Sequence, residues 1–122
     1  MTNDWPELAR TLTADLRQLR VGSPEVMKTF AAMATGAGAS GALDAKTTEL
    51  IALAVSVAVR CDDCIAFHTK AAVARGATRE EVTETLGMAI YMGAGPSVMY
   101  ASHALAAFTQ FDAEKTAQPS VG

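Results

Sequence analysis

The sequence has few cysteines, few aromatic residues and no basic cluster, and each shortage excludes a class of protein. Two cysteines in 122 residues are too few for the disulfide framework of a small secreted domain. Ten Lys and Arg against 13 Asp and Glu give a net charge of −3, so nucleic acid is not an expected partner. The longest nearly uniform apolar run, residues 50–59, is about half the roughly 20 residues that a membrane-spanning helix needs. Since the first residues also show no signal peptide, we expect a cytoplasmic protein.

What the chain does contain is enough apolar sequence for one folded domain. Half of the residues are hydrophobic and 19% are charged, which excludes a disordered chain. At 12.7 kDa, surface scaling predicts that about two-thirds of the unfolded surface is buried on folding. Alanine is frequent, and it favours helix and close helix approach.

Helix-start signals and glycine-rich breaks divide the chain into six predicted helices. Thr78 followed by Glu81 has the form of a capping box, and Gly76 is placed to end the preceding helix. No convincing strand pattern is present, so the predicted fold is an all-α, six-helix bundle formed by residues 1–111, with 112–122 as a mobile tail. The predicted helices run from Asp4 to Gly22, from Ser23 to the loop at 36–41, from Asp44 to about Arg60, from Cys61 or Asp62 to Gly76, from Arg79 to about Met92, and from about Ser97 to Phe111.

Two thiols and an imidazole are predicted to share one helix face. Cys61, Cys64 and His68 are spaced i, i+3 and i+7, which places them within about 60° of one another around a helix. The first thiol lies near a helix N-terminus, where partial positive charge favours the thiolate. A nearby imidazole can accept the thiol proton or hold the anion, so this pattern is typical of an activated thiol.

Several readings of these residues stay open from spacing alone. Cys61 and Cys64 can also be small buried hydrophobic residues. With His68 and His103 they could supply four zinc ligands, although the sequence has no second C-x-x-C. Glu49 either faces solvent or turns its carboxylate toward His68 as a proton store. His103 is more often a packed or surface histidine than a functional one. Thioredoxin-type chemistry shares the C-x-x-C motif but needs a βαβ context, which is missing.

The combined pattern resembles a known family. The spacing Glu49-x11-Cys61-x2-Cys64-x3-His68 is similar to the signature of the alkylhydroperoxidase D-like group within the carboxymuconolactone decarboxylase family. Residues 71–84 and 91–97 resemble the same family, so the similarity covers roughly residues 43–111.

The resemblance implies a fold, an activity and a set of roles. It implies an all-helical chain that assembles as a homotrimer or homohexamer and reduces small hydroperoxides or disulfides without a metal or organic cofactor. It implies that Cys64 attacks the substrate and passes through a sulfenic acid. Cys61 then resolves it as a Cys61–Cys64 disulfide, which an external dithiol or thiol protein reduces. His68 and Glu49 are implied to relay protons.

The chain departs from the best-studied type of this family between the cysteines. That type has a histidine where this sequence has Asp63, and an aspartate adds negative charge beside the thiols. Together with Asp62 it predicts a slow thiol, better suited to disulfide exchange than to rapid peroxide removal. The alternatives are a carboxymuconolactone decarboxylase-like lyase, whose founding members generally lack the paired cysteines, and a non-catalytic helical assembly module with buried or zinc-binding cysteines.

Overall fold

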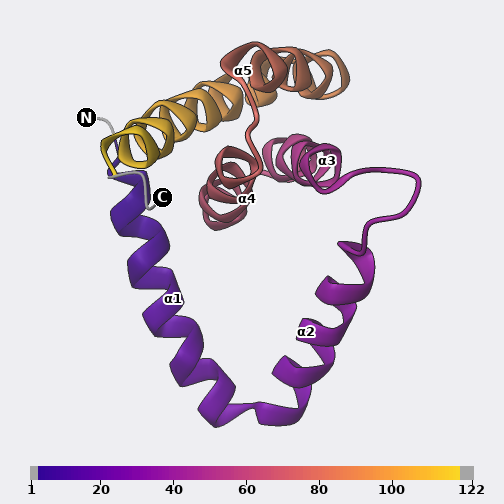
Figure 1. The fold of residues 1–122 in the computed structure, drawn as a ribbon, viewed down its shortest axis with the longest axis vertical. Coiled ribbons are helices and arrows are strands. Elements are labelled where there is room, and N and C mark those ends of the chain that lie inside the picture. Colours follow the sequence, from indigo (N-terminus) through magenta and orange to yellow (C-terminus); the bar gives the residue numbers. More distant parts are fainter. Residues whose placement is uncertain (1–2, 119–122) are drawn as a thin grey trace.

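The computed structural model describes residues 3–118, and all the regular structure in that range is helical. The all-α prediction is therefore confirmed. Among these residues, no helix is both long enough and apolar enough to span a membrane. The helices are α1 (Trp5–Gly22), α2 (Pro24–Ala37), α3 (Ala45–Ala58), α4 (Asp62–Ala74) and α5 (Arg79–Ala117), shown in Figure 1.

Most helix ends form as local sequence rules require. The side chains of Asp4, Asp44 and Thr78 each accept a hydrogen bond from a backbone amide in the first turn of α1, α3 and α5. The Thr78–Glu81 capping box is confirmed in both directions, since each side chain bonds the other residue's amide. Gly76 has a φ of 82°, the left-handed conformation expected of a glycine that follows a helix.

The prediction of six helices becomes five because the last two are joined. The expected break at 93–96 is present as a kink, where Ala94 has φ 53° and ψ −138° inside α5. Pro96 lies just beyond Ala94, and the ring of a proline cannot continue a regular helix from the preceding turn. The glycines and the proline predicted an interruption at 93–96, but they did not show whether it would be a loop or a bend within one helix.

The predicted end of the last helix at Phe111 is wrong, because α5 continues to Ala117. The added turns lack an apolar period but contain good helix formers, and Lys115 Nζ donates a hydrogen bond to the carbonyl of Val73 at 2.9 Å. That contact ties the end of α5 to the last turn of α4. The rest of the predicted mobile tail, residues 119–122, lies outside the described residues.

Helices α3, α4 and α5, together with the first turns of α1, form what we call the body. Its core side chains are almost fully buried, with Leu53 and Val57 of α3, Ile65 of α4 and Val82 of α5 each 0% exposed. Trp5 anchors α1 to this core, and its amide donates to Gln110 Oε1 of α5 at 2.7 Å. Helix α3 contributes to this core through one face only. The other face leaves Ile51, Val55 and Val59 exposed.

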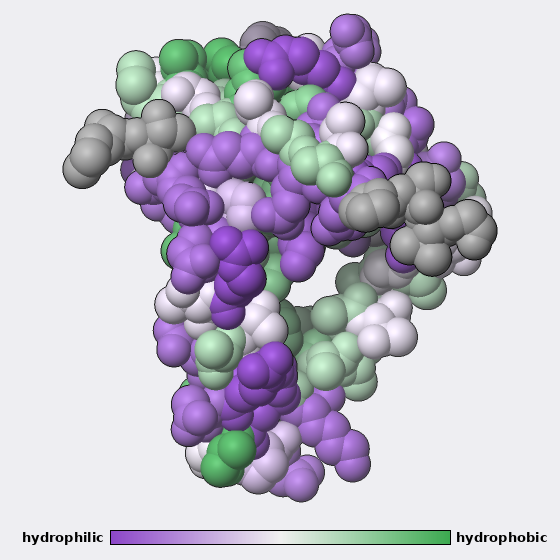
Figure 2. Space-filling model, turned by 60° about the vertical axis from the view of Figure 1, so that its left-hand side comes forward, coloured by the Kyte–Doolittle hydropathy of each residue, from purple (hydrophilic) through white to green (hydrophobic). Residues whose placement is uncertain are grey.

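The remainder of α1, beyond Ala9, and the whole of α2 form what we call the arm. Figure 1 shows α1 descending from the body and α2 returning toward it at an angle. Figure 2 shows an open gap between arm and body, bordered in part by hydrophobic side chains. No residue of α2 is buried, and its large side chains Val26, Phe30 and Met33 are each more than half exposed.

Candidate functional site

The connection between α3 and α4 places the first cysteine. Arg60 adopts φ 61° after the last turn of α3, and its amide donates to the Val57 carbonyl at 3.2 Å. The amide of Cys61 donates to the Ser56 carbonyl at 3.0 Å. This pair of bonds is a Schellman ending, which reverses the chain within two residues. Cys61 therefore becomes the residue that caps α4.

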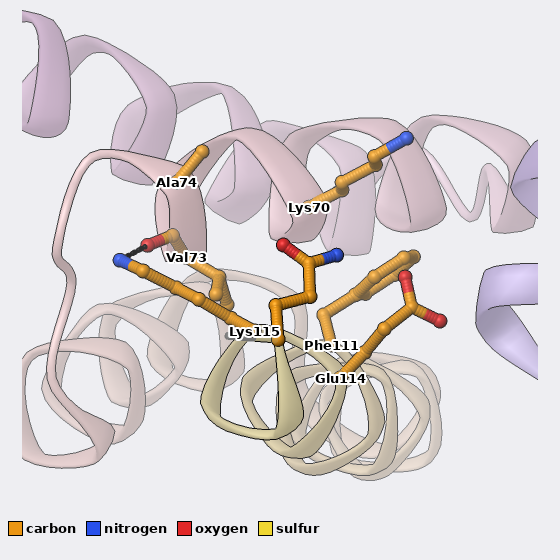
Figure 3. Close-up of a pocket in the computed structure, with 7 residues that line it drawn as sticks. Lys70, Val73, Ala74, Phe111, Glu114 and Lys115 are labelled. Carbon is orange, nitrogen blue, oxygen red and sulfur yellow. Dashed lines mark hydrogen bonds between the residues drawn. The ribbon is translucent and has the colours of Figure 1, made fainter. Parts of the chain in front are cut away.

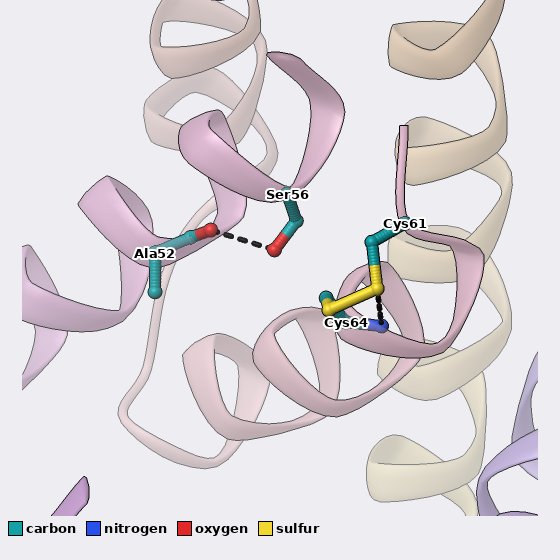
Figure 4. The surroundings of a disulfide bond; sticks show 4 residues. All are labelled: Ala52, Ser56, Cys61 and Cys64. Atoms are coloured by element: carbon teal, nitrogen blue, oxygen red, sulfur yellow. Dashed lines mark hydrogen bonds between the residues drawn. A yellow bond between two sulfur atoms is a disulfide. The ribbon is translucent and has the colours of Figure 1, made fainter. Parts of the chain in front are cut away.

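Cys61 and Cys64 form a disulfide across the first turn of α4, with 5.2 Å between their Cα atoms. The bond is drawn in Figure 4, where Ser56 of α3 lies on the neighbouring helix. The Cys61 sulfur accepts a hydrogen bond from the Cys64 amide at 3.1 Å. An amide at a helix N-terminus stabilises negative charge, so this contact favours the anionic form of Cys61 when the disulfide is reduced.

Glu49 and His68 meet beside this turn from two different helices. Glu49 Oε2 of α3 lies 2.8 Å from His68 Nδ1 of α4, and the two side chains are 26% and 39% exposed. Of the two readings of Glu49, the contact with His68 is the one observed. When Nδ1 carries a proton, it donates a hydrogen bond to the carboxylate. That bond fixes the orientation of the ring and leaves Nε2 free to exchange a proton.

An ion pair fixes the first turn of α3, one turn before Glu49. Lys46 Nζ lies 2.8 Å from Glu81 Oε2 in the first turn of α5. The hydrogen bond from Lys46 holds the pKa of Glu81 below its ordinary value, and the same bond raises the pKa of Lys46. Glu81 also accepts from the Thr78 amide, so the capping box and the ion pair share one carboxylate.

A second carboxylate–imidazole pair was not predicted. Asp62 Oδ1, in the residue after Cys61, lies 3.7 Å from His103 Nδ1 of α5. The His103 ring packs between Trp5 and Tyr100, with ring centroids 6.1 and 5.2 Å away. The sequence singled out His103 but gave no partner for it, because helix periodicity cannot align two helices so far apart along the chain.

The four proposed zinc ligands are not arranged as a metal site. The sulfurs of Cys61 and Cys64 are bonded to each other, and His68 and His103 pair with different carboxylates. Within residues 3–118, no group of three or more His, Cys, Asp or Glu side chains is placed to hold a metal ion.

A hollow of ≈ 300 Å³ between the end of α4 and the end of α5 does not include the disulfide. Figure 3 shows the aliphatic chain of Lys115 and the ring of Phe111 on its walls. None of the four predicted site residues lines it. Its lining residues are Lys70, Val73, Ala74, Phe111, Glu114, Lys115 and Gln118.

Comparison with known proteins identifies the family. The model of the carboxymuconolactone decarboxylase family matches residues 24–107, which is most of the chain and includes the whole disulfide region. The chain belongs to the carboxymuconolactone decarboxylase family. The resemblance read from the sequence is therefore confirmed at the level of the family.

The chain is also similar to individual proteins over most of its length, one of them a named member of this family. A solved carboxymuconolactone decarboxylase family protein from Legionella pneumophila is 49% identical and covers 88% of this chain and 96% of its own, with a TM-score of 0.86. A solved Thermotoga maritima protein is 30% identical, with 84% and 97% coverage and a TM-score of 0.74. An uncharacterized protein of Cupriavidus necator is 40% identical over 113 residues, which is 93% of this chain and all of the relative.

Proposed function

We propose that this carboxymuconolactone decarboxylase family member is a thiol-dependent oxidoreductase that reduces small hydroperoxides or disulfides. One observation carries the proposal: the Cys61–Cys64 disulfide lies at a helix start beside the Glu49–His68 pair. A disulfide between two cysteines of one turn is the oxidised state that a thiol redox cycle needs. Return to the reduced state needs proton transfer to the thiols, for which an imidazole hydrogen-bonded to a carboxylate is suited.

With a disulfide substrate, the Cys64 sulfur attacks one substrate sulfur and a first thiol leaves; Cys61 then attacks Cys64, and the second thiol leaves as the Cys61–Cys64 disulfide forms. With a hydroperoxide, the Cys64 sulfur attacks the terminal oxygen, the O–O bond breaks, and Cys64 becomes a sulfenic acid as an alcohol leaves. The Cys61 thiol then attacks the Cys64 sulfur, water leaves, and the disulfide forms. An external dithiol reduces the disulfide and is itself oxidised. The cytoplasm, where dithiol reductants are maintained, suits this cycle.

Cys64 is assigned as the attacking thiol because of its position relative to His68. The two residues are four apart on α4, so their side chains lie on one face. His68 takes the thiol proton, and Glu49 stabilises the imidazolium that results. Asp63 is exposed between the cysteines, and its negative charge opposes a second negative charge on sulfur. We therefore expect disulfide exchange to be favoured over rapid peroxide reduction.

Assembly with further copies of the chain, as a homotrimer or homohexamer, belongs to the same proposal. The arm carries Val26, Phe30 and Met33 into solvent, and the body exposes Ile51, Val55 and Val59. Covering large apolar side chains contributes about 1.5–3 kcal/mol each. A second copy supplies both surfaces in equal number, and a net charge of −3 opposes association only weakly.

The decisive experiment is a thiol count by intact mass, before and after peroxide or a small-molecule disulfide, with turnover followed in excess dithiol. We expect wild type to cycle between two thiols and none. Cys64→Ser should abolish turnover, whereas Cys61→Ser should accumulate a sulfenic acid or mixed disulfide at Cys64. Full turnover in Cys64→Ser would refute the assigned role. A disulfide that neither peroxide nor dithiol changes would refute the proposed activity.

The Glu49–His68 relay is tested with a matched pair of carboxylates. Glu49→Gln should slow turnover by about 10²-fold or more, in line with loss of general acid–base assistance. Glu84→Gln, an exposed carboxylate on α5, removes the same charge away from the site and should leave turnover unchanged. Lactone decarboxylation by the wild-type protein, without thiol cycling, would instead favour the lyase activity that the family also includes.

A further inference from the structure

We propose that Asp62 and His103 form a second acid–base pair that controls the ionisation of Cys61, separately from the Glu49–His68 pair that serves Cys64. The inference rests on the proposed thiol chemistry and assigns to the resolving thiol its own positioning residues. Two cysteines that exchange a bond each need a proton removed or returned. The structure contains two carboxylate–imidazole pairs, one joining α4 to α3 and the other joining the first turn of α4 to α5.

The facing atoms of this second pair are shielded and unsatisfied. Asp62 Oδ1 and His103 Nδ1 are both buried from solvent, and neither has a hydrogen-bond partner within the described residues. They are 3.7 Å apart, although the two side chains are otherwise 46% and 42% exposed. A buried polar atom without a partner is unfavourable. A proton on Nδ1 would let the ring donate toward the carboxylate and give both atoms a partner.

The charge state of the pair acts on the neighbouring sulfur. Asp62 directly follows Cys61 in the chain, so an unopposed Asp62 carboxylate adds negative charge beside the thiol and disfavours the thiolate. When the His103 ring is protonated, the pair is neutral overall and that opposition is removed. Trp5 and Tyr100 lie beside the ring, and Asp62 supplies a negative charge that faces it.

The two pairs have different geometry, which suits different tasks. Glu49 and His68 are in hydrogen-bond contact at 2.8 Å, so the ring is held in one orientation. Asp62 and His103 stand 3.7 Å apart without a hydrogen bond, so the His103 ring is not fixed by its carboxylate in the same way. During reduction by an external dithiol, Cys61 departs as a thiolate or a thiol. The second pair decides how readily it departs.

The experiment isolates Cys61 by using Cys64→Ser, since the chain has two cysteines. The rate of iodoacetamide alkylation is measured by intact mass at about pH 5.5 and about pH 8, on either side of the range in which imidazole titrates. In this background, His103→Gln should slow alkylation about threefold to tenfold at the lower pH and leave it unchanged at the higher pH. Asp62→Asn should accelerate it by a similar factor at the higher pH.

Two further variants separate electrostatics from misfolding. His103→Gln should have a smaller effect at the lower pH once Asp62→Asn is present, because the carboxylate that favours a proton on the ring is gone. His103→Lys keeps a positive charge and should accelerate alkylation at about pH 8. In the Cys61→Ser background, where Cys64 is the remaining thiol, His68→Gln should change the profile and His103→Gln should not.

Equal Cys61 rates in all five proteins of the Cys64→Ser background at both pH values would overturn the inference. That result is distinct from failure of the proposed function, in which the wild-type disulfide would not exchange with a dithiol at all. Alkylation needs no substrate and no turnover, so it reports on Cys61 whichever molecule the protein reduces.

Discussion

The helices of the body and of the arm follow the same local sequence rules, but the body buries its apolar side chains and the arm leaves them exposed. In the body, α3, α4 and α5 bury Leu53, Ile65 and Val82 completely. In the arm, α2 begins with a proline and carries an apolar face, but none of its residues is buried. The difference shows that an amphipathic pattern predicts a helix and a face to be covered, without saying whether the same chain covers it.

The body is completed within one chain, and this is why it holds the candidate site. Glu49 and His68 come from α3 and α4, and Asp62 and His103 from α4 and α5. Each pair bridges two helices whose spacing is fixed by the buried core. The arm carries no comparable pair among its described residues, and its apolar side chains point to the association that we propose.

The largest expected effect is a loss of stability in the core of the body. Leu53→Ala removes a fully buried side chain from α3 and should lower the free energy of unfolding by about 2–5 kcal/mol. The measurement is urea unfolding followed by circular dichroism. Ile51→Ala on the exposed face of α3 should cost less in the single chain, and an equally large loss there would mean that the proposed assembly covers this face.

The second prediction addresses the arm. Phe30→Asp places a charge on the exposed face of α2, where a single chain would tolerate it. If a second copy covers that face, burying an unpaired charge should dissociate the assembly, measured by light scattering. Lys28→Asp, on an exposed position of the same helix, is the control. Wild type that is a 12.7 kDa monomer at micromolar concentration would contradict the proposed assembly.

The sequence predicted the local features of the body, such as helix caps and turns, but not the features that depend on how the helices pack together. The caps at Asp4, Asp44 and Thr78 and the turn at Gly76 are decided by nearest neighbours, so they were predictable. The extension of α5 to Ala117 depends on a distant contact of Lys115 with α4, so it was not.

The candidate site divides in the same way. Spacing predicted one helix face for Cys61, Cys64 and His68; α4 carries Cys64 and His68, whereas Cys61 is the extended residue that caps it. Glu49 was left with two readings until α3 and α4 were seen together. Pairing Asp62 with His103 needed the crossing of α4 and α5. The catalytic roles of these residues remain predictions that the thiol experiments test.

The third prediction concerns the kink of α5 in the body. A Cβ added at Gly93 would overlap Ser97 Oγ and lie 2.9 Å from Ser97 Cβ, and Ser97 is buried. Gly93→Ala should therefore destabilise the protein by about 1–3 kcal/mol, measured by thermal unfolding. Gly95→Ala meets nothing within 4 Å and serves as the control. Adding Ser97→Gly should recover part of the loss, and no recovery would show that the overlap is not the cause.

The smallest expected effect is the pH dependence of the ion pair that joins α3 and α5. Lys46 lowers the pKa of Glu81, so their contribution to stability is present above the ordinary Glu value of 4.5 and is lost as pH falls through the lower folded value. The pKa of Lys46 is raised above 10.5, so its share is present below that value and is lost as pH rises through the folded one. Glu81→Gln should thus lower Tm slightly between these limits, and the difference from wild type should disappear in acid.

Salt gives an independent check on that last effect. The pair is partly exposed, so added NaCl should reduce the difference in Tm between wild type and Glu81→Gln at neutral pH. Because Glu81 also bonds the Thr78 amide, a neutral glutamine keeps the capping geometry while losing the charge. A Tm difference that persists unchanged in acid and in high salt would mean that the cap, rather than the ion pair, holds the start of α5 against α3.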